Sequence, residues 1–287
     1  MLILPIKGFS FSEKYYKKYG FRPLVDIDLL IKEEELPRGV HLLETLGYKK
    51  ILSKGKEEYW RKNQCHLEFL KDASDNRTPL DLHWALDLKG DILPSVWQRI
   101  KKINMADITA PGPSLEDTIF SLSLHQRRFG KILNLKYVCD MGLILKDASL
   151  IDWGYIFKTA REGQFKSCLF FLLAQAQSVL DIDLAKYLGG LKVPLWKRLL
   201  IFKFIKRFSC RSFKNDPKAY YLYLLCHFLL YDNIKEPVKY IINIPEEQFA
   251  KFYKLPLYET RTGRLYKIRF FYIAYRLMID WLRKDPL

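Results

Sequence analysis

The acidic pair Asp26 and Asp28 is the strongest single restriction on how this chain folds. Apolar residues alternate with the two aspartates, which is the two-residue period of an extended strand. Such a strand carries both carboxylates on one face and its apolar side chains on the other. The apolar members of the alternation are Val25, Ile27 and Leu29. The pattern therefore predicts a strand that is packed on one side and acidic on the other.

Two carboxylates this close repel each other, and each raises the pKa of the other unless a cation lies between them. A divalent ion that prefers oxygen ligands fits such a position. Mg²⁺ commonly binds one or two carboxylates together with substrate phosphates. An Asp-x-Asp pair alone is a weak signal, so the surrounding sequence decides what it means.

The first supporting segment is Lys7-Gly8-Phe9-Ser10, which lies between a predicted strand and a predicted helix. A glycine at such a turn lets backbone N–H groups approach a phosphate, and the helix N-terminus adds partial positive charge. Ser10 can donate a hydrogen bond to the same phosphate. The alternative is purely structural, since many strand-to-helix turns need a glycine.

The second supporting segment is Leu80-Asp81-Leu82-His83-Trp84, which alternates again. Alternation puts Asp81 and His83 on the face opposite Leu80 and Leu82. If this strand lies beside the first, three carboxylates converge, which fits a two-metal arrangement for phosphoryl transfer. Asp81 would then help to deprotonate the acceptor hydroxyl while pyrophosphate leaves. His83 either orients a neighbouring group or acts as a ligand itself.

Residues 1 to about 90 show the pattern of a mixed α/β region, because short alternating runs are mixed with stretches of helical period. The predicted strands cover 2–6, 25–31, 49–52, 58–61, 66–70 and 80–84. The predicted helices cover 9–19 and 36–46, and Gly47 ends the second.

Pro111-Gly112-Pro113 marks the clearest boundary in the chain and is predicted to form a loop. After it, apolar residues recur with a period of about 3.6, and Ser114 with the acids that follow it is typical of a helix start. Helices are predicted at about 130–147, 152–162, 165–180, 183–188, 194–209, 217–230 and 263–283. We therefore predict an α+β fold, with an N-terminal α/β domain over 1–112 and a helical domain over 113–287.

The chain carries 48 Lys and Arg against 32 Asp and Glu, a net charge of +16. This excess favours a polyanionic partner such as RNA, a nucleotide or an acidic membrane surface, and the alternative is a merely solvated basic surface. The block 192–218 is both basic and aromatic. It fits an RNA-binding surface, an interfacial membrane helix, or an amphipathic helix whose inner face contains Trp196, Leu199, Leu200, Phe202-Phe204 and Phe208.

The five cysteines lie far apart without a C-x-x-C pair, which argues against the usual zinc spacing and against a disulfide framework. Reduced thiols favour a cytoplasmic protein. No stretch reaches the roughly 18 to 20 apolar residues that cross a bilayer. The start, Met1 to Ile6, does not have the pattern of a signal peptide. Met1 can also be a late start that omits part of the site.

Together, Lys7-Gly8-Phe9-Ser10, the run from Arg22 through Asp26-Ile27-Asp28, and Leu80-Asp81-Leu82-His83-Trp84 resemble the nucleotidyltransferases of the DNA polymerase β superfamily. The nearest resemblance within it is to a little-characterised bacterial group called nucleotidyltransferase family protein. The later stretch from Leu115-Glu116-Asp117 through Asp140-Met141-Gly142 to Asp152-Trp153 resembles the helical half of that group. The resemblance covers roughly residues 3 to 180.

The resemblance implies a polymerase-β-like catalytic domain and an enzyme that transfers a nucleoside monophosphate from an NTP such as ATP. By that resemblance, Asp26 and Asp28 bind catalytic Mg²⁺ or Mn²⁺, and Asp81 completes the triad. Gly8 and Ser10 hold the triphosphate, whose charge Lys7 and Arg22 neutralise. The acceptor is an RNA such as tRNA, a protein, a sugar phosphate or a small molecule, and the basic charge favours RNA.

Two departures accompany the resemblance. Lys7 stands where superfamily members usually have a glycine, and Leu24-Val25 stands where many have Ser or Thr. Two other functions therefore stay open: a catalytically silent relative that binds RNA or a protein, and a peripheral membrane component of a polysaccharide pathway.

Arg22 can instead pair with a surface acid. Asp140, an acid in an apolar helix, is expected to accept hydrogen bonds from a helix end or from an Arg such as Arg127 or Arg128, which would join the two halves.

Overall fold

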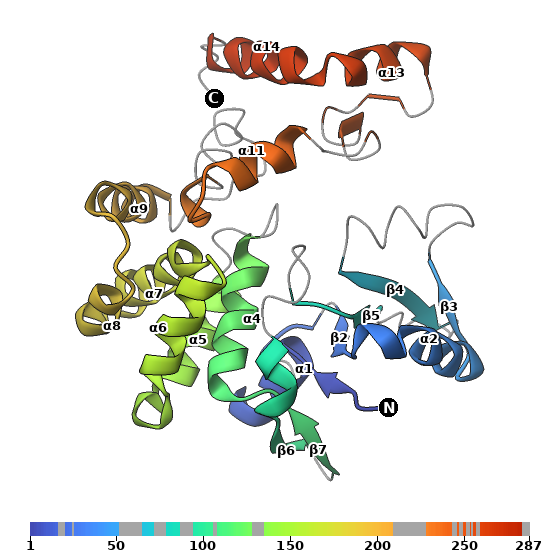
Figure 1. Cartoon of the computed structure of the whole chain (residues 1–287), viewed down its shortest axis with the longest axis vertical. Helices are drawn as coiled ribbons and strands as arrows, with labels where there is room; N and C mark the ends of the chain where they lie inside the picture. The colour runs from blue at the N-terminus through green and yellow to red at the C-terminus, as the bar shows by residue number, and fades with distance from the viewer. Residues whose placement is uncertain are drawn as a thin grey trace.

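The structure is a computed structural model in which a small sheet and a set of helices lie on opposite sides of the molecule (Figure 1). A pair of helices near the C-terminus lies at one end. The structure describes residues 1–16, 21–24, 26–51, 65–71, 79–86, 94–105, 108–127, 135–208, 228–242, 246, 249–250, 253, 255–256 and 259–282.

The sheet has five strands in the order β1-β2-β5-β4-β3. Strands β2 and β5 run parallel, and the other neighbouring pairs are antiparallel. The strands are β1 (Leu4–Pro5), β2 (Ile27–Leu30), β3 (Tyr48–Lys50), β4 (His66–Lys71) and β5 (Leu80–His83). The predicted mixed sheet is therefore confirmed, and the strand predicted at 58–61 lies outside the described residues.

Helix α2 (Leu36–Thr45) covers one face of the sheet. It buries Leu36, Val40 and Leu43 against alternate residues of the strands. The strand residues of this core include Leu67, Phe69, Leu80 and Leu82. Gly47, with a φ of 84°, follows the helix in the left-handed conformation that favours glycine. The predicted helix over 36–46 is therefore confirmed.

A short helix and a hairpin connect the sheet to the rest of the chain. Helix α1 (Gly8–Phe11) continues into the π-helical turn η1 (Ser12–Tyr16), and the remainder of the predicted helix over 9–19 lies outside the described residues. Strands β6 (Lys101–Met105) and β7 (Ile108–Gly112) form a separate hairpin.

The predicted loop at Pro111-Gly112-Pro113 is wrong for its first two residues, which pair with Lys102 and Lys101 within the hairpin. A two-stranded ribbon tolerates proline because each strand has a free edge. A Cβ at Gly112 would lie 2.5 Å from Ile103 Cδ1, so close strand contact explains this glycine.

The later part of the described chain is helical, as predicted. Ser114 begins α4, because its Oγ accepts a hydrogen bond from the Asp117 N–H at 3.1 Å. The helices are α4 (Leu115–Arg127), α5 (Leu135–Leu145), α6 (Trp153–Glu162), α7 (Lys166–Leu180), α8 (Ala185–Gly190), α9 (Leu195–Phe208), α11 (Lys235–Ile242), α13 (Thr260–Lys267) and α14 (Arg269–Leu282). The helix predicted at 263–283 is two helices, which meet at Ile268. Most of the one predicted at 217–230 lies outside the described residues.

One hydrophobic core joins the two halves of the sequence. Leu4, Phe11 and Leu30 belong to the same buried cluster as Phe120 and Met141. Helix α7 lies within this cluster and is buried on all sides along most of its length, which is typical of a central helix. The domain boundary at 112/113 stays a prediction, and the core crosses it.

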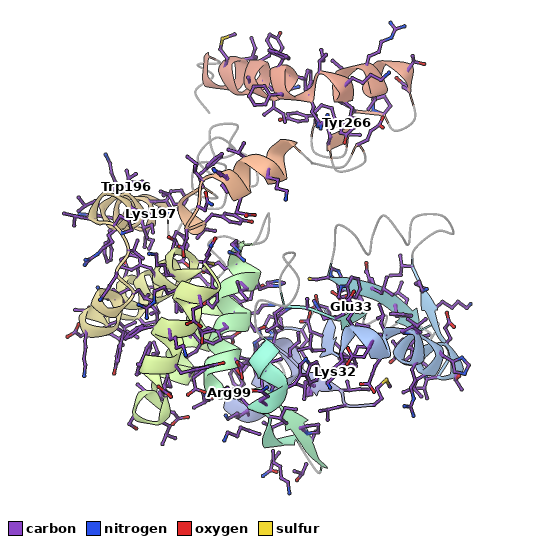
Figure 2. The ribbon with its side chains drawn as sticks, in the orientation of Figure 1. Lys32, Glu33, Arg99, Trp196, Lys197 and Tyr266 are labelled. Atoms are coloured by element: carbon purple, nitrogen blue, oxygen red, sulfur yellow. The ribbon has the colours of Figure 1, made fainter. Side chains whose placement is uncertain are left out.

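The predicted inner face of helix α9 is confirmed for Phe204, which is buried, and wrong for Trp196 and Leu199, which are about three-fifths exposed. Lys197, labelled beside Trp196 in Figure 2, is buried instead. The Lys197 ammonium donates to the Tyr231 carbonyl at 2.6 Å, and this partner stabilises a lysine on the inner face. The inner face also contains Ile201, Phe204 and Ile205. Nowhere in the described ranges does a helix reach the length and apolarity needed to cross a membrane.

Candidate active site

The two acidic strands lie side by side, as their alternation predicts. In the parallel pair β2–β5, Asp28 is the direct partner of Asp81, and Leu30 is the partner of His83. Directly paired residues point to the same face of a sheet. This is the face opposite helix α2, so the predicted meeting of Asp28 and Asp81 is confirmed.

Strand β4 adds two polar residues to the same face. Glu68 pairs with Asp81, and His66 pairs with His83 across the antiparallel β4–β5 ladder. The His66 and His83 rings stack with their centroids 5.0 Å apart. Neither residue was predicted to belong to the site, although the alternation within the predicted strand 66–70 already places them on one face.

Asp28 is the acid of this face whose negative charge is most strongly stabilised. Its Oδ1 accepts hydrogen bonds from Lys7 Nζ at 3.0 Å and from His83 Nε2 at 2.8 Å, and the residue is only 5% exposed. Burial alone would raise the pKa of Asp28, but the Lys7 ammonium and the His83 bond together hold that pKa well below its usual value. Asp28 is therefore an anion at neutral pH.

Asp81 has the opposite environment. Burial raises its pKa, and repulsion from Asp28, Asp26 and Glu68 raises it further, to about 7. Asp26 is half-buried just before β2, and its effect on Asp81 shows that it belongs to the same acidic cluster. The cluster therefore contains more negative charge than its own cations neutralise.

This deficit of positive charge fits a divalent cation. Asp28, Asp81 and His83 each offer one ligand atom, and these three atoms lie within 4.8 Å of one another. Carboxylates suit Mg²⁺ and Mn²⁺, so the residues present fit the metal ion that the sequence analysis predicts. Lys7 already binds Asp28 Oδ1, so an ion at that oxygen has to displace the ammonium.

The predicted phosphate turn is tightly packed around Gly8. A Cβ at this position would lie 3.1 Å from Leu24 Cδ2 and 3.3 Å from the terminal Nη1 of Arg22, so close approach requires glycine. Lys7 has a φ of 55°, the left-handed conformation that favours glycine, although a lysine stands there. The side chain of Ser10 lies outside what the structure describes.

Arg22 is buried in an ion pair with Asp140 of α5. Its Nε donates to Oδ1 at 2.9 Å and its Nη2 donates to Oδ2 at 2.7 Å, and Tyr16 also donates to Oδ1. Within the described chain no acceptor lies within hydrogen-bond distance of Arg22 Nη1, the nitrogen closest to the Gly8 turn.

The partner of Asp140 is therefore Arg22, not Arg127 or Arg128 as predicted, and Arg128 lies outside the described residues. The planar guanidinium satisfies both oxygens of a buried carboxylate at once, which favours this pairing. The expected connection between the two halves is confirmed. The alternative for Arg22, a surface acid, is wrong because Asp140 is fully buried.

Comparison with known proteins gives one family. The profile of a protein family described as "Uncharacterised nucleotidyltransferase" matches residues 2–181, which include the acidic strands, the Gly8 turn and Asp140. No curated protein and no solved structure matches the chain significantly.

Proposed function

The chain belongs to the uncharacterised nucleotidyltransferase family, and from that premise we propose that it transfers a nucleoside monophosphate from an NTP to an acceptor, with release of pyrophosphate. The single observation that carries this proposal is the direct pairing of Asp28 with Asp81 on adjacent parallel strands. Few structural needs place two carboxylates opposite each other on a half-buried face, whereas a metal-dependent transferase needs them there.

Asp28 and Asp81, together with Asp26 and the nearby His83, would hold Mg²⁺ or Mn²⁺. When bound, such an ion neutralises phosphate charge and lowers the pKa of an attacking oxygen. His83 orients the Asp28 carboxylate through its hydrogen bond of 2.8 Å. Asp81 is also the proposed general base, because it lies beside Asp28 on the same face of the sheet, next to where the attacking oxygen would bind.

The triphosphate would lie at the Gly8 turn. Leu24 and Arg22 pack against Gly8, so a phosphate at this turn would contact Arg22 Nη1, while Asp140 binds the other two nitrogens of the guanidinium. Lys7 would move from Asp28 to the phosphates once the acids bind a metal ion. Ser10 stays a predicted phosphate ligand.

Net charge of +16 favours a polyanionic acceptor, so an RNA such as tRNA is the proposed acceptor class. A second candidate function also has a specific observation in its favour. The Lys7 ammonium, 3.0 Å from Asp28 Oδ1, already neutralises the carboxylate that a metal would bind. This contact favours a catalytically silent, nucleotidyltransferase-like module that binds RNA or a protein.

Incubation of the purified protein with Mg²⁺ or Mn²⁺ and α-labelled NTPs separates the two candidates. The enzyme should release pyrophosphate and give a labelled acceptor. The double variant Asp26→Asn/Asp28→Asn should lower that rate by about three orders of magnitude or more, since it removes several kcal/mol of charge stabilisation.

Asp183→Asn is the matched control, because it makes the same chemical change at an exposed position between α7 and α8. A double variant as active as the wild type would contradict the proposed mechanism. Binding of NTP and Mn²⁺ without pyrophosphate release, measured by calorimetry, would support the silent module.

A further inference from the structure

A second group of metal-compatible side chains lies beside the acids on the same sheet. Cys65, His66 and His83 each offer one ligand atom, and these three atoms lie within 4.8 Å of one another. We propose that these three residues form a binding site for a soft divalent transition-metal ion of the zinc class. The proposal goes beyond nucleotidyl transfer and does not depend on it.

Strand pairing brings these residues together. His66 and His83 are direct partners across β4 and β5, and their rings stack. Cys65 comes immediately before β4 and is only 1% exposed. Its carbonyl accepts a hydrogen bond of 3.0 Å from the Trp84 N–H, which fixes this residue next to the end of β5. The ligands are thus positioned by backbone pairing, which is more rigid than a loop.

The donor set differs in chemistry from the acids. A thiolate and two imidazoles are the ligands of zinc-class ions, whereas Mg²⁺ takes oxygen. Tetrahedral bonds of about 2.0 Å to nitrogen and 2.3 Å to sulfur bring ligand atoms to within roughly 4 Å of one another. Side-chain shifts of about 1 Å are therefore enough to close the site around an ion. Binding releases the Cys65 thiol proton to solvent.

Asp81 lies next to this site, because its carboxylate belongs to the group with Asp28 and His83 and not to the one with Cys65. Its Oδ2 lies 3.7 Å from His66 Nε2. The other contents of the face are Glu68, which pairs with Asp81, and Asp28, which binds His83. A zinc-class ion would therefore use His83, which the proposed catalytic ion also needs.

Sharing of His83 makes the two ions competitors. An ion held by Cys65, His66 and His83 would also place a second positive charge close to the proposed catalytic ion, and the two charges would repel each other. Micromolar zinc should therefore inhibit the transferase. This one consequence rests on the proposed function, and the site itself does not.

Cobalt(II) is the probe, because its complexes with thiolates absorb strongly in the near ultraviolet. Metal-free wild type titrated with Co²⁺ should develop a thiolate-to-cobalt band that saturates at one ion per chain. Zn²⁺ should remove the band, and excess Mg²⁺ should leave it. Cys65→Ser should abolish the band, while Cys139→Ser, the same change at an exposed cysteine of α5, should keep it.

A second variant covers the case in which buried Cys65→Ser fails to fold. His66→Gln alters a half-buried residue and should weaken Co²⁺ binding at least about tenfold while it keeps a thiolate band. Asp26→Asn/Asp28→Asn should retain the band even though it blocks nucleotidyl transfer, so failure of one proposal does not imply failure of the other. Any one of three results overturns the site: no band in folded wild type, a band that survives Cys65→Ser, or unchanged Co²⁺ affinity in His66→Gln.

Discussion

The two faces of the five-stranded sheet are built from alternate residues of the same strands, yet they have opposite effects on the stability of the fold. On one face, Leu67 and Phe69 are fully buried under α2, and this burial stabilises the fold. On the other face, Glu68 and Asp81 oppose each other as like charges, and burial adds to the cost. The comparison shows that one face holds the sheet together, which lets the other keep an unfavourable but reactive arrangement.

The largest expected effect is on the apolar face. Phe69→Ala should lower the free energy of unfolding by about 4 kcal/mol, because it removes a buried aromatic ring and leaves a cavity. Urea denaturation at two pH values, with and without Mg²⁺, measures this loss. The loss should be the same under all four conditions, and dependence on Mg²⁺ would show that the two faces are coupled.

Lys7→Met tests the ammonium that lies 3.0 Å from Asp28 Oδ1. In metal-free protein it should lower the free energy of unfolding by about 3 kcal/mol, because a buried anion loses its partner. Mg²⁺ should then stabilise this variant more than the wild type, since the ion no longer competes with an ammonium. Lys32→Met, at an exposed lysine, is the control. Equal stability of Lys7→Met and wild type would show that the ion pair contributes nothing.

Asp81→Asn should stabilise the metal-free protein at alkaline pH. The folded state raises the Asp81 pKa from 3.8 to about 7, so the wild type loses stability as pH rises between these values. The shift corresponds to at most about 4 kcal/mol, and we expect about half of that because the side chain keeps some contact with water. Thermal melts of both proteins from pH 4 to pH 8 should diverge only above pH 4. Parallel curves would contradict the raised pKa.

Glu68→Gln should have the smallest effect. It removes one of the three negative charges that raise the Asp81 pKa, after Asp28 and Asp26 in size. Stability at pH 8 should rise by less than about 1 kcal/mol. The sharper readout is carboxyl carbon NMR, in which the Asp81 pKa should move toward its ordinary value. An unchanged Asp81 pKa would show that the Glu68 charge does not act on Asp81.

Sequence alternation was enough to predict the local parts of this molecule. The strand around Asp28, the strand around Asp81 and the side on which each acid lies all follow from a two-residue period. Helix α7 and the Ser114 cap follow from equally local signals. Each of these features depends on neighbours within a few residues.

The sequence predicted that Asp28 meets Asp81 and that Asp140 joins the two halves, but it could not identify most of the distant partners of individual side chains. Arg22 was predicted to bind phosphate or a surface acid, because its actual partner, Asp140, lies 118 residues away. Lys197 has the sequence pattern of a solvated charge, whereas in the structure its ammonium donates a hydrogen bond to the Tyr231 carbonyl. Cysteine spacing argued against zinc, but spacing along the chain says nothing about Cys65 and His83, which meet only when β4 and β5 pair.

The Arg22–Asp140 ion pair has a consequence for where the chain can be truncated. A fragment that ended at Gly112 would keep a desolvated guanidinium without its acid, and it would expose Leu4, Phe11 and Leu30 where the helices now pack. Such a fragment should be unfolded or aggregate in isolation. We therefore expect the sheet and the helices to unfold as one cooperative unit, and neither half to fold when it is transplanted without the other.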